Sequence, residues 1–301
     1  MPGVIEALEA VGGLAAGQWG LVTTAQARAE GLSTQQMARL AAAGVLERLR
    51  HGVYRAAGVP AGPHDELRAA WLALEPAKTV GARLADPGVE VVSHRSAALL
   101  HQLGDLDADY LEFTTRTRKQ TRDRQVRLHR RLLEPQEWTL ALGLPVTTVL
   151  TTIRDLAAAQ IDGGHLAGVV RDAVTDHHLG VDEVAGVLSL YAHHYGAPLG
   201  QGAVLLQRML EMAGVPDSAQ AVARLVSRYD PAESVRQVLA SAAGIPHVDM
   251  GALESIRQAL EANTAAIRGI DADALASVLR VAAGDPVAPR QRLDSDRDEH
   301  A

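Results

Sequence analysis

Residues 21–57 constrain the fold of this chain more than any other stretch, because helix-start signals and a hairpin pattern follow one another closely there. The sequences TTAQ (23–26) and STQQ (33–36) both match a capping box, in which a hydroxyl and a Gln side chain satisfy the first turn of a helix. Two short alternating segments follow, at 45–50 and 53–56, on either side of a His-Gly turn. Two short capped helices followed by a hairpin predict a winged helix-turn-helix.

The second helix of this unit is amphipathic. Met37 and Leu40 are spaced to share one buried face, which predicts that Gln35, Gln36 and Arg39 point outward. Gln can pair with adenine and Arg with guanine, and arginines on a hairpin suit phosphates. A plain solvated helix face is the alternative, but the surrounding pattern favours contact with double-stranded DNA. The residues predicted to bind DNA are Thr24, Ser33, Thr34, Gln35, Gln36, Arg39, Arg48, Arg50, His51 and Arg55.

A second candidate surface is a basic run over residues 116–131. Eight basic side chains stand there against one acid, Asp123, which gives a local charge of +7 in a chain whose net charge is −7. This density attracts phosphates, but RNA, an acidic protein surface or a plain exposed loop remain alternatives. The absence of aromatic residues from the run argues against stacking on single-stranded bases. The basic patch consists of Arg116, Arg118, Lys119, Arg122, Arg124, Arg127, Arg130 and Arg131.

Composition narrows the class of protein. The 301 residues are enough for two or three domains, and because only 3% are aromatic, the core must consist mainly of Leu, Val, Ile and Ala. The absence of cysteine excludes disulfides and thiolate metal sites, which agrees with a reducing compartment. No segment approaches the roughly 18 consecutive apolar residues of a membrane span. We therefore expect a cytoplasmic protein without membrane contact.

The chain is predicted to be α+β and mostly helical. We expect a winged helix-turn-helix domain at 1–60, an α+β domain with the basic loop at 61–164, a helical domain at 165–284 and a disordered tail at 285–301. The strands expected in the middle domain cover 89–92, 110–115 and 125–129. The expected helices cover 4–14, 64–74, 93–104, 146–159, 166–178, 182–195, 201–212, 218–229, 232–242, 253–267 and 273–282.

No group of residues in the sequence indicates an active site. The aspartates within 105–109 precede Glu112, but the lysine that a metal-dependent nuclease would place two residues after that Glu is missing. Neighbouring histidines at 177–178 and 193–194 would point about 100° apart on a helix, which is unsuited to holding one ion. His94 lacks a recognisable catalytic partner. We therefore predict no enzymatic activity, no cofactor and no metal.

Four segments follow one another in a recognisable order: GLVTTAQARAEGLS, the GVYR of the hairpin, SHRSAALLHQLGDL and LPVTTVLTTIRDLA. In this order they resemble the AbiEi family, the antitoxins of abortive-infection, type IV toxin–antitoxin systems, over about residues 1–159. The resemblance implies a repressor of its own promoter whose C-terminal region opposes a nucleotidyltransferase-like toxin without requiring a stable complex. A homodimer on the DNA is compatible with this role.

Three hypotheses follow. The first is a DNA-binding antitoxin and transcriptional autorepressor of this type. The alternative is a stand-alone winged-helix regulator whose C-terminal region dimerises or senses a ligand. The third hypothesis, a metal-dependent nuclease, is the weakest because the expected lysine is missing.

Overall fold

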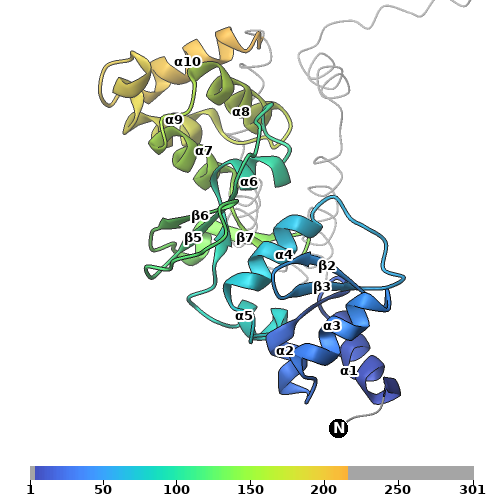
Figure 1. The fold of residues 1–301 in the computed structure, drawn as a ribbon. Coiled ribbons are helices and arrows are strands. Elements are labelled where there is room, and N and C mark those ends of the chain that lie inside the picture. Colours follow the sequence, from blue (N-terminus) through green and yellow to red (C-terminus); the bar gives the residue numbers. More distant parts are fainter. Residues whose placement is uncertain (1–3, 216–301) are drawn as a thin grey trace, which may run out of the picture. The chain divides into compact units, whose positions relative to one another are not determined.

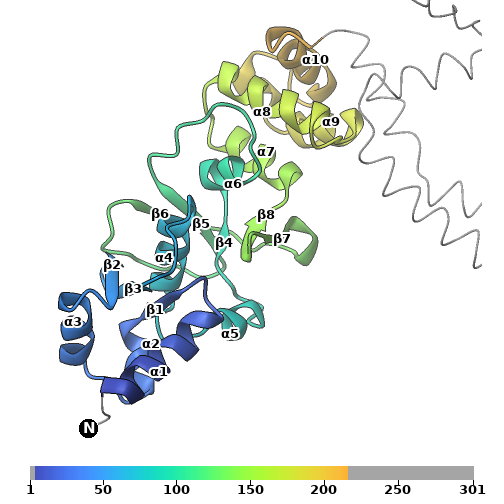
Figure 2. The same ribbon diagram turned by 90° about the vertical axis from the view of Figure 1, so that its right-hand side faces the viewer.

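The computed structural model of the protein describes residues 4–215, which lie within one unit spanning Met1–Arg228. These residues form ten α-helices, two short 3-10 helices and two β-sheets, so the predicted α+β class is confirmed. Figures 1 and 2 show helices and a small sheet near the N-terminus, then a larger sheet, then a group of helices. No helix among the described residues is long and apolar enough to cross a membrane.

Three helices and a three-stranded sheet make up residues 4–57, which we call the N-terminal module. Its strand order is β1-β3-β2, and both pairings are antiparallel. The predicted first helix and the predicted hairpin are confirmed, whereas the three-residue strand β1 is too short for the sequence pattern to reveal. The elements are α1 (Val4–Ala16), β1 (Leu21–Thr23), α2 (Thr24–Ala29), α3 (Thr34–Ala42), β2 (Leu46–Arg50) and β3 (Val53–Ala56).

Both predicted capping boxes form. Thr23 Oγ1 accepts the N–H of Gln26 at 3.1 Å, and Gln26 Oε1 accepts the N–H of Thr23 at 3.0 Å. Ser33 and Gln36 exchange the same pair of hydrogen bonds at the start of α3. These bonds satisfy donors that a helix start leaves unpaired. The helices then pack around the buried side chains Ala7, Val11, Val22, Ala27, Leu32, Met37, Leu40, Leu46 and Tyr54.

The middle of the described chain contains a five-stranded sheet with the order β6-β5-β4-β8-β7. The pairs β4–β8 and β5–β6 are parallel, whereas β4–β5 and β7–β8 are antiparallel. The strands predicted over 89–92, 110–115 and 125–129 are confirmed, with ends that differ by one or two residues. The elements are α4 (Asp65–Leu74), α5 (Val80–Leu84), β4 (Val91–Val92), α6 (His94–Leu100), β5 (Leu111–Thr115), β6 (Val126–Arg130), a 3-10 turn (Pro135–Glu137), β7 (Trp138–Ala141) and β8 (Leu144–Thr147).

The hairpin β7–β8 corrects the prediction of a helix over 146–159. Val146 and Thr147 belong to β8, and the helix α7 begins only at Val149. All four residues of β8 are buried, and Thr148 Oγ1 accepts the N–H of Thr151 at 3.3 Å to start the helix. A short buried strand cannot be distinguished from a buried helix segment by its apolar pattern alone.

Four helices pack around an apolar cluster that includes Leu166, Leu188 and Leu206. α8 begins before the predicted residue 166, because Asp162 Oδ1 accepts two backbone N–H groups. The helix predicted over 182–195 is divided into α9 and a 3-10 turn. The elements are α7 (Val149–Ala158), α8 (Gly163–Thr175), α9 (Val181–Ser189), the 3-10 turn (Ala192–Tyr195) and α10 (Gly202–Met212). Outside the described residues lie the helices predicted over 218–229, 232–242, 253–267 and 273–282, and the tail 285–301.

The N-terminal module packs directly onto the middle sheet. Leu21 and Val53 of the module belong to the same buried cluster as Trp71 and Phe113. The rings of Trp19 and Trp71 meet edge to face with their centroids 6.1 Å apart. Apolar side chains from both sides of residue 60 therefore share one core, and the domain limits at 60, 164 and 284 stay predictions.

Candidate nucleic-acid interface

The exposed face of α3 carries small and polar side chains. Gln35 and Arg39 are exposed with Ala38 between them, and Met37 and Leu40 are buried on the opposite side of the helix. Within residues 4–215, no ion pair or side-chain hydrogen bond engages Gln35 or Arg39. A glutamine and an arginine are therefore available on α3 for contact with base edges.

Other polar residues near the starts of α2 and α3 serve the fold. Gln36, predicted to face outward, bends back so that its Oε1 accepts the N–H of Ser33 at 2.7 Å. Thr34 is exposed in the first turn of α3. The N–H of Thr24 donates to the carbonyl of Gly52 at 2.9 Å, so the start of α2 fixes the turn of the hairpin. Gln36 is half-exposed, and the cap holds its amide oxygen against the start of α3.

The tip of the β2–β3 hairpin is cationic and exposed. Arg48 and His51 are both exposed, and Arg48 Nη2 lies 3.0 Å from His51 Nδ1. The strand register shifts between Arg48 and Arg50, which marks an irregularity at the end of β2. The structure thus presents two of the predicted hairpin residues to solvent.

The other two hairpin arginines form ion pairs within the protein, contrary to the expectation that they are available to phosphates. Arg55 lies between Asp65, at 2.8 Å, and Glu47. The hydrogen bond to Glu47 is the main cause that raises the pKa of Arg55. The side chain of Arg50 is only 7% exposed and pairs with Glu66 at 3.1 Å. Asp65 and Glu66 lie on α4, and Glu47 faces Arg55 across the β2–β3 pair. The sequence pattern alone does not reveal these contacts.

The basic run divides into anchored and unanchored residues. Lys119 pairs with Glu75 and Glu90, and the guanidinium of Arg127 lies 3.7 Å from the ring centroid of Tyr110. Arg131 pairs with two acids of the middle region, Glu137 at 3.5 Å and Asp155 at 3.1 Å. Five residues of the run are exposed and have neither an ion pair nor a ring contact among the described residues: Arg116, Arg118, Arg122, Arg124 and Arg130.

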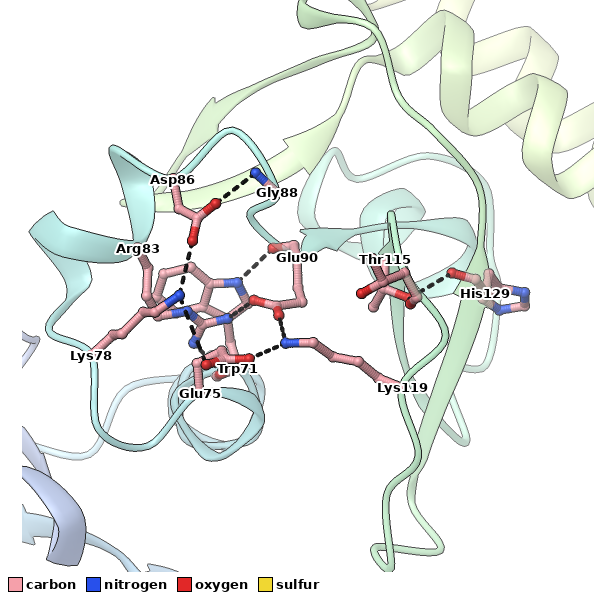
Figure 3. A network of polar contacts seen from close by, with 11 residues as sticks. Trp71, Glu75, Lys78, Arg83, Asp86, Gly88, Glu90, Thr115, Lys119 and His129 are labelled. Atoms are coloured by element: carbon pink, nitrogen blue, oxygen red, sulfur yellow. Dashed lines mark hydrogen bonds and ion pairs between the residues drawn. The ribbon is translucent and has the colours of Figure 1, made fainter.

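Lys119 belongs to a buried polar network that the sequence does not reveal (Figure 3). Arg83 pairs with Glu90, and its guanidinium lies 3.5 Å from the ring centroid of Trp71. The indole N–H of Trp71 donates to the carbonyl of Glu90 at 2.7 Å. Burial alone would lower the pKa of Lys119, but hydrogen bonds to Glu75 and Glu90 outweigh it and raise the pKa. The network therefore holds one end of the basic run against the sheet.

A second polar cluster forms where β4 meets α6. The rings of His94 and His129 stack with centroids 3.6 Å apart, and His129 Nε2 lies 3.1 Å from Glu112 Oε1. Burial, followed by the charge of His129, lowers the pKa of His94 to about 4. Nearby, burial raises the pKa of Asp155 to about 6, although Arg131 opposes the shift. Sequence analysis identifies His94 but not its partners, which lie on β5 and β6.

The residues considered for metal chemistry remain apart. Within residues 4–215, no three His, Asp or Glu side chains gather into a group that could hold an ion. Asp105, Asp107 and Asp109 are exposed. His177 Nε2 contacts the carbonyl of His101 at 2.8 Å. The structure therefore offers the third hypothesis no assembled site among the residues it describes.

Comparison with known proteins supports a regulatory role for the N-terminal module. Residues 14–57 match the model of a family described as transcriptional regulator, AbiEi antitoxin. The match begins within α1 and ends just after β3, so the resemblance inferred from the sequence is confirmed over these residues. The matched family is one of transcriptional regulators rather than of enzymes. No curated protein matches the chain.

Proposed function

We propose that the protein is a DNA-binding antitoxin and transcriptional autorepressor of a type IV toxin–antitoxin system, acting in the cytoplasm on its own promoter. The observation that carries the proposal is the exposed pair Gln35 and Arg39 on α3, in the same module as the cationic hairpin tip and inside the residues that match the regulator family. In this proposal residues 4–57 act as a winged helix-turn-helix. α3 enters the major groove, and Arg48 and His51 contact the phosphate backbone.

The test of DNA recognition is the affinity of the full chain for its own upstream region. Replacing Arg39 by Ala should weaken binding there by about 1–3 kcal/mol and weaken binding to random DNA less. Arg208→Ala is the matched control, because Arg208 is an exposed arginine on α10 and, among residues 4–215, its side chain bonds only the carbonyl of Gly196. Equal losses on both DNAs would make Arg39 a phosphate contact, and no binding by the unmodified chain would refute the proposal.

The proposed antitoxin role rests on the rest of the chain. Between residues 58 and 215 the structure contains a five-stranded sheet and seven α-helices, α4 to α10, which is more than a DNA-binding module requires. We infer that this part opposes a nucleotidyltransferase-like toxin encoded beside it. Co-expression with the neighbouring gene should restore growth for the full chain and also for Arg39→Ala, whose change is confined to the module. Failure of the full chain to rescue growth would leave the alternative, a stand-alone regulator.

A further inference from the structure

The hairpin tip and the basic run are joined by a direct contact. Arg50, at the end of β2, pairs with Asp123 and donates to Gln125 Oε1 at 2.6 Å. The same guanidinium reaches Glu66 on α4, so its side chain is almost fully buried. A segment more than 70 residues further along the chain thus lies directly against the hairpin of the N-terminal module.

The connection between β5 and β6, which we call loop 116–125, is held at two places. Lys119 is bound by Glu75 and Glu90, and Asp123 is bound by Arg50 (Figure 3 shows the Lys119 contacts). Asp123 also accepts the N–H of Gln125 at 2.9 Å, which shapes the end of the loop. Two anchors fix the loop in the folded protein, so binding a partner need not pay the full entropy of ordering it.

The Arg50 contact also determines which charges of the loop remain available. Asp123 is the only acid in the loop, and it is paired with Arg50. Its two sequence neighbours, Arg122 and Arg124, are exposed and have no ion pair within residues 4–215. Two unpaired guanidinium groups therefore lie one residue away from the contact with the hairpin.

We propose that the hairpin tip (Arg48 and His51) together with Arg122 and Arg124 forms one continuous surface for the backbone of a single DNA duplex. This inference rests on the proposed function, and it extends the DNA footprint beyond the winged helix-turn-helix. Consecutive Cα atoms lie about 3.8 Å apart, and one DNA strand presents a phosphate about every 3.4 Å along the axis. Arg48 and His51 lie within two residues of Arg50, and Arg122 and Arg124 are the neighbours of Asp123, so the Arg50–Asp123 pair brings the two cationic groups toward each other.

The chemistry of the loop favours DNA over a protein partner. Residues 116–125 contain no apolar and no aromatic side chain, whereas protein interfaces depend on buried aromatic and apolar anchors. The loop offers guanidinium, hydroxyl and amide groups, which are the groups that contact phosphate oxygens. Glu66, Asp109 and Asp123 line an open depression of about 380 Å³ beside Arg50, and Arg50 pairs with two of these three carboxylates, Glu66 and Asp123.

The experiment measures the affinity of full-length protein for its own upstream DNA as a function of salt. The variant Arg122→Gln/Arg124→Gln should lower the log–log salt slope by about 0.9 for each lost contact, hence by up to about 1.8. Affinity should fall by a similar factor on the upstream DNA and on random DNA, and hydroxyl-radical protection should shrink at one edge of the footprint. Arg171→Gln/Arg208→Gln carries the same charge change on α8 and α10 and should change neither the slope nor the footprint.

The outcomes separate this inference from the proposed function. If the unmodified chain binds no DNA, both fall together. If the unmodified chain binds but Arg122→Gln/Arg124→Gln retains its salt slope and footprint, the continuous surface is refuted and the proposed function stands. If that variant binds DNA normally but loses growth rescue or RNA binding, the loop serves another partner and the inference is wrong. Circular dichroism of each variant checks that the fold is retained.

Discussion

The ion pair between Arg83 and Glu90 leads to a quantitative prediction about stability. Their side chains are 1% and 3% exposed, which places two opposite charges almost entirely out of water. Removing one member of a buried pair leaves the other charge uncompensated and typically costs about 3–5 kcal/mol. We expect Glu90→Gln to cost about 3 kcal/mol, the lower end, because the amide still accepts hydrogen bonds and Lys119 still pairs with Glu75.

This cost is large compared with a total unfolding free energy of about 5–15 kcal/mol for a domain. The double variant Arg83→Met/Glu90→Gln removes both charges, so it should cost less than the sum of the two single variants by about 0.5–3 kcal/mol. Urea unfolding is followed by circular dichroism at 222 nm, a wavelength chosen to monitor helix content. It gives the unfolding free energies of the unmodified chain, the two single variants and the double variant. A loss under about 1 kcal/mol for Glu90→Gln, or strictly additive losses, would refute the argument.

The same carboxylate makes stability depend on pH. Burial, the largest single effect, raises the pKa of Glu90, but Arg83 and Lys119 together outweigh it and hold the pKa below the ordinary 4.5. A depressed pKa means that the contribution of Glu90 to stability is present above 4.5 and is lost as the pH falls through the folded-state value. The difference in unfolding free energy between the protein and Glu90→Gln should therefore shrink in acid.

Two further predictions concern α3 and the histidine cluster. Ser33→Ala removes the cap of α3 and should cost about 1 kcal/mol in urea unfolding, with weaker binding to the upstream DNA; an unchanged stability would mean that the cap is not needed. The pKa of His94 is lowered from 6.5 to about 4. Its contribution to the free energy of unfolding is therefore fully present above pH 6.5 and is lost as the pH falls toward 4. His94→Asn, which tolerates the backbone angle φ of 53°, should flatten the melting temperature over that range, and an equally steep profile would contradict this.

Local signals account for the parts of the fold that the sequence predicts. The capping boxes at Thr23 and Ser33 and the hairpin turn at His51-Gly52 depend on residues close in sequence, and all three form. The strand β8 escapes prediction because its apolar residues also suit a buried helix. The order of strands in the larger sheet depends on long-range pairing, which no local pattern contains.

The candidate interface likewise combines features that the sequence predicts with features that it does not. The exposure of Gln35 and Arg39 follows from the helical period around Met37 and Leu40. The burial and ion pairing of Arg50 cannot be predicted from helical or strand periodicity, because its carboxylate partners lie 16 and 73 residues away. A sequence pattern identifies which side chains are charged, whereas only the tertiary fold determines which of them are already neutralised.

The location of the tryptophans has a practical consequence. The chain has three tryptophans, and Trp19, Trp71 and Trp138 all belong to the cluster where the N-terminal module meets the middle sheet. Arginine side chains lie over two of them, Arg68 at 5.2 Å from the Trp19 ring centroid and Arg83 over Trp71. Intrinsic tryptophan fluorescence therefore reports, without any added label, on the contact between the N-terminal module and the middle sheet. A partner that separates the module from the sheet would shift the emission maximum, whereas DNA that contacts α3 and leaves the module packed on the sheet would not.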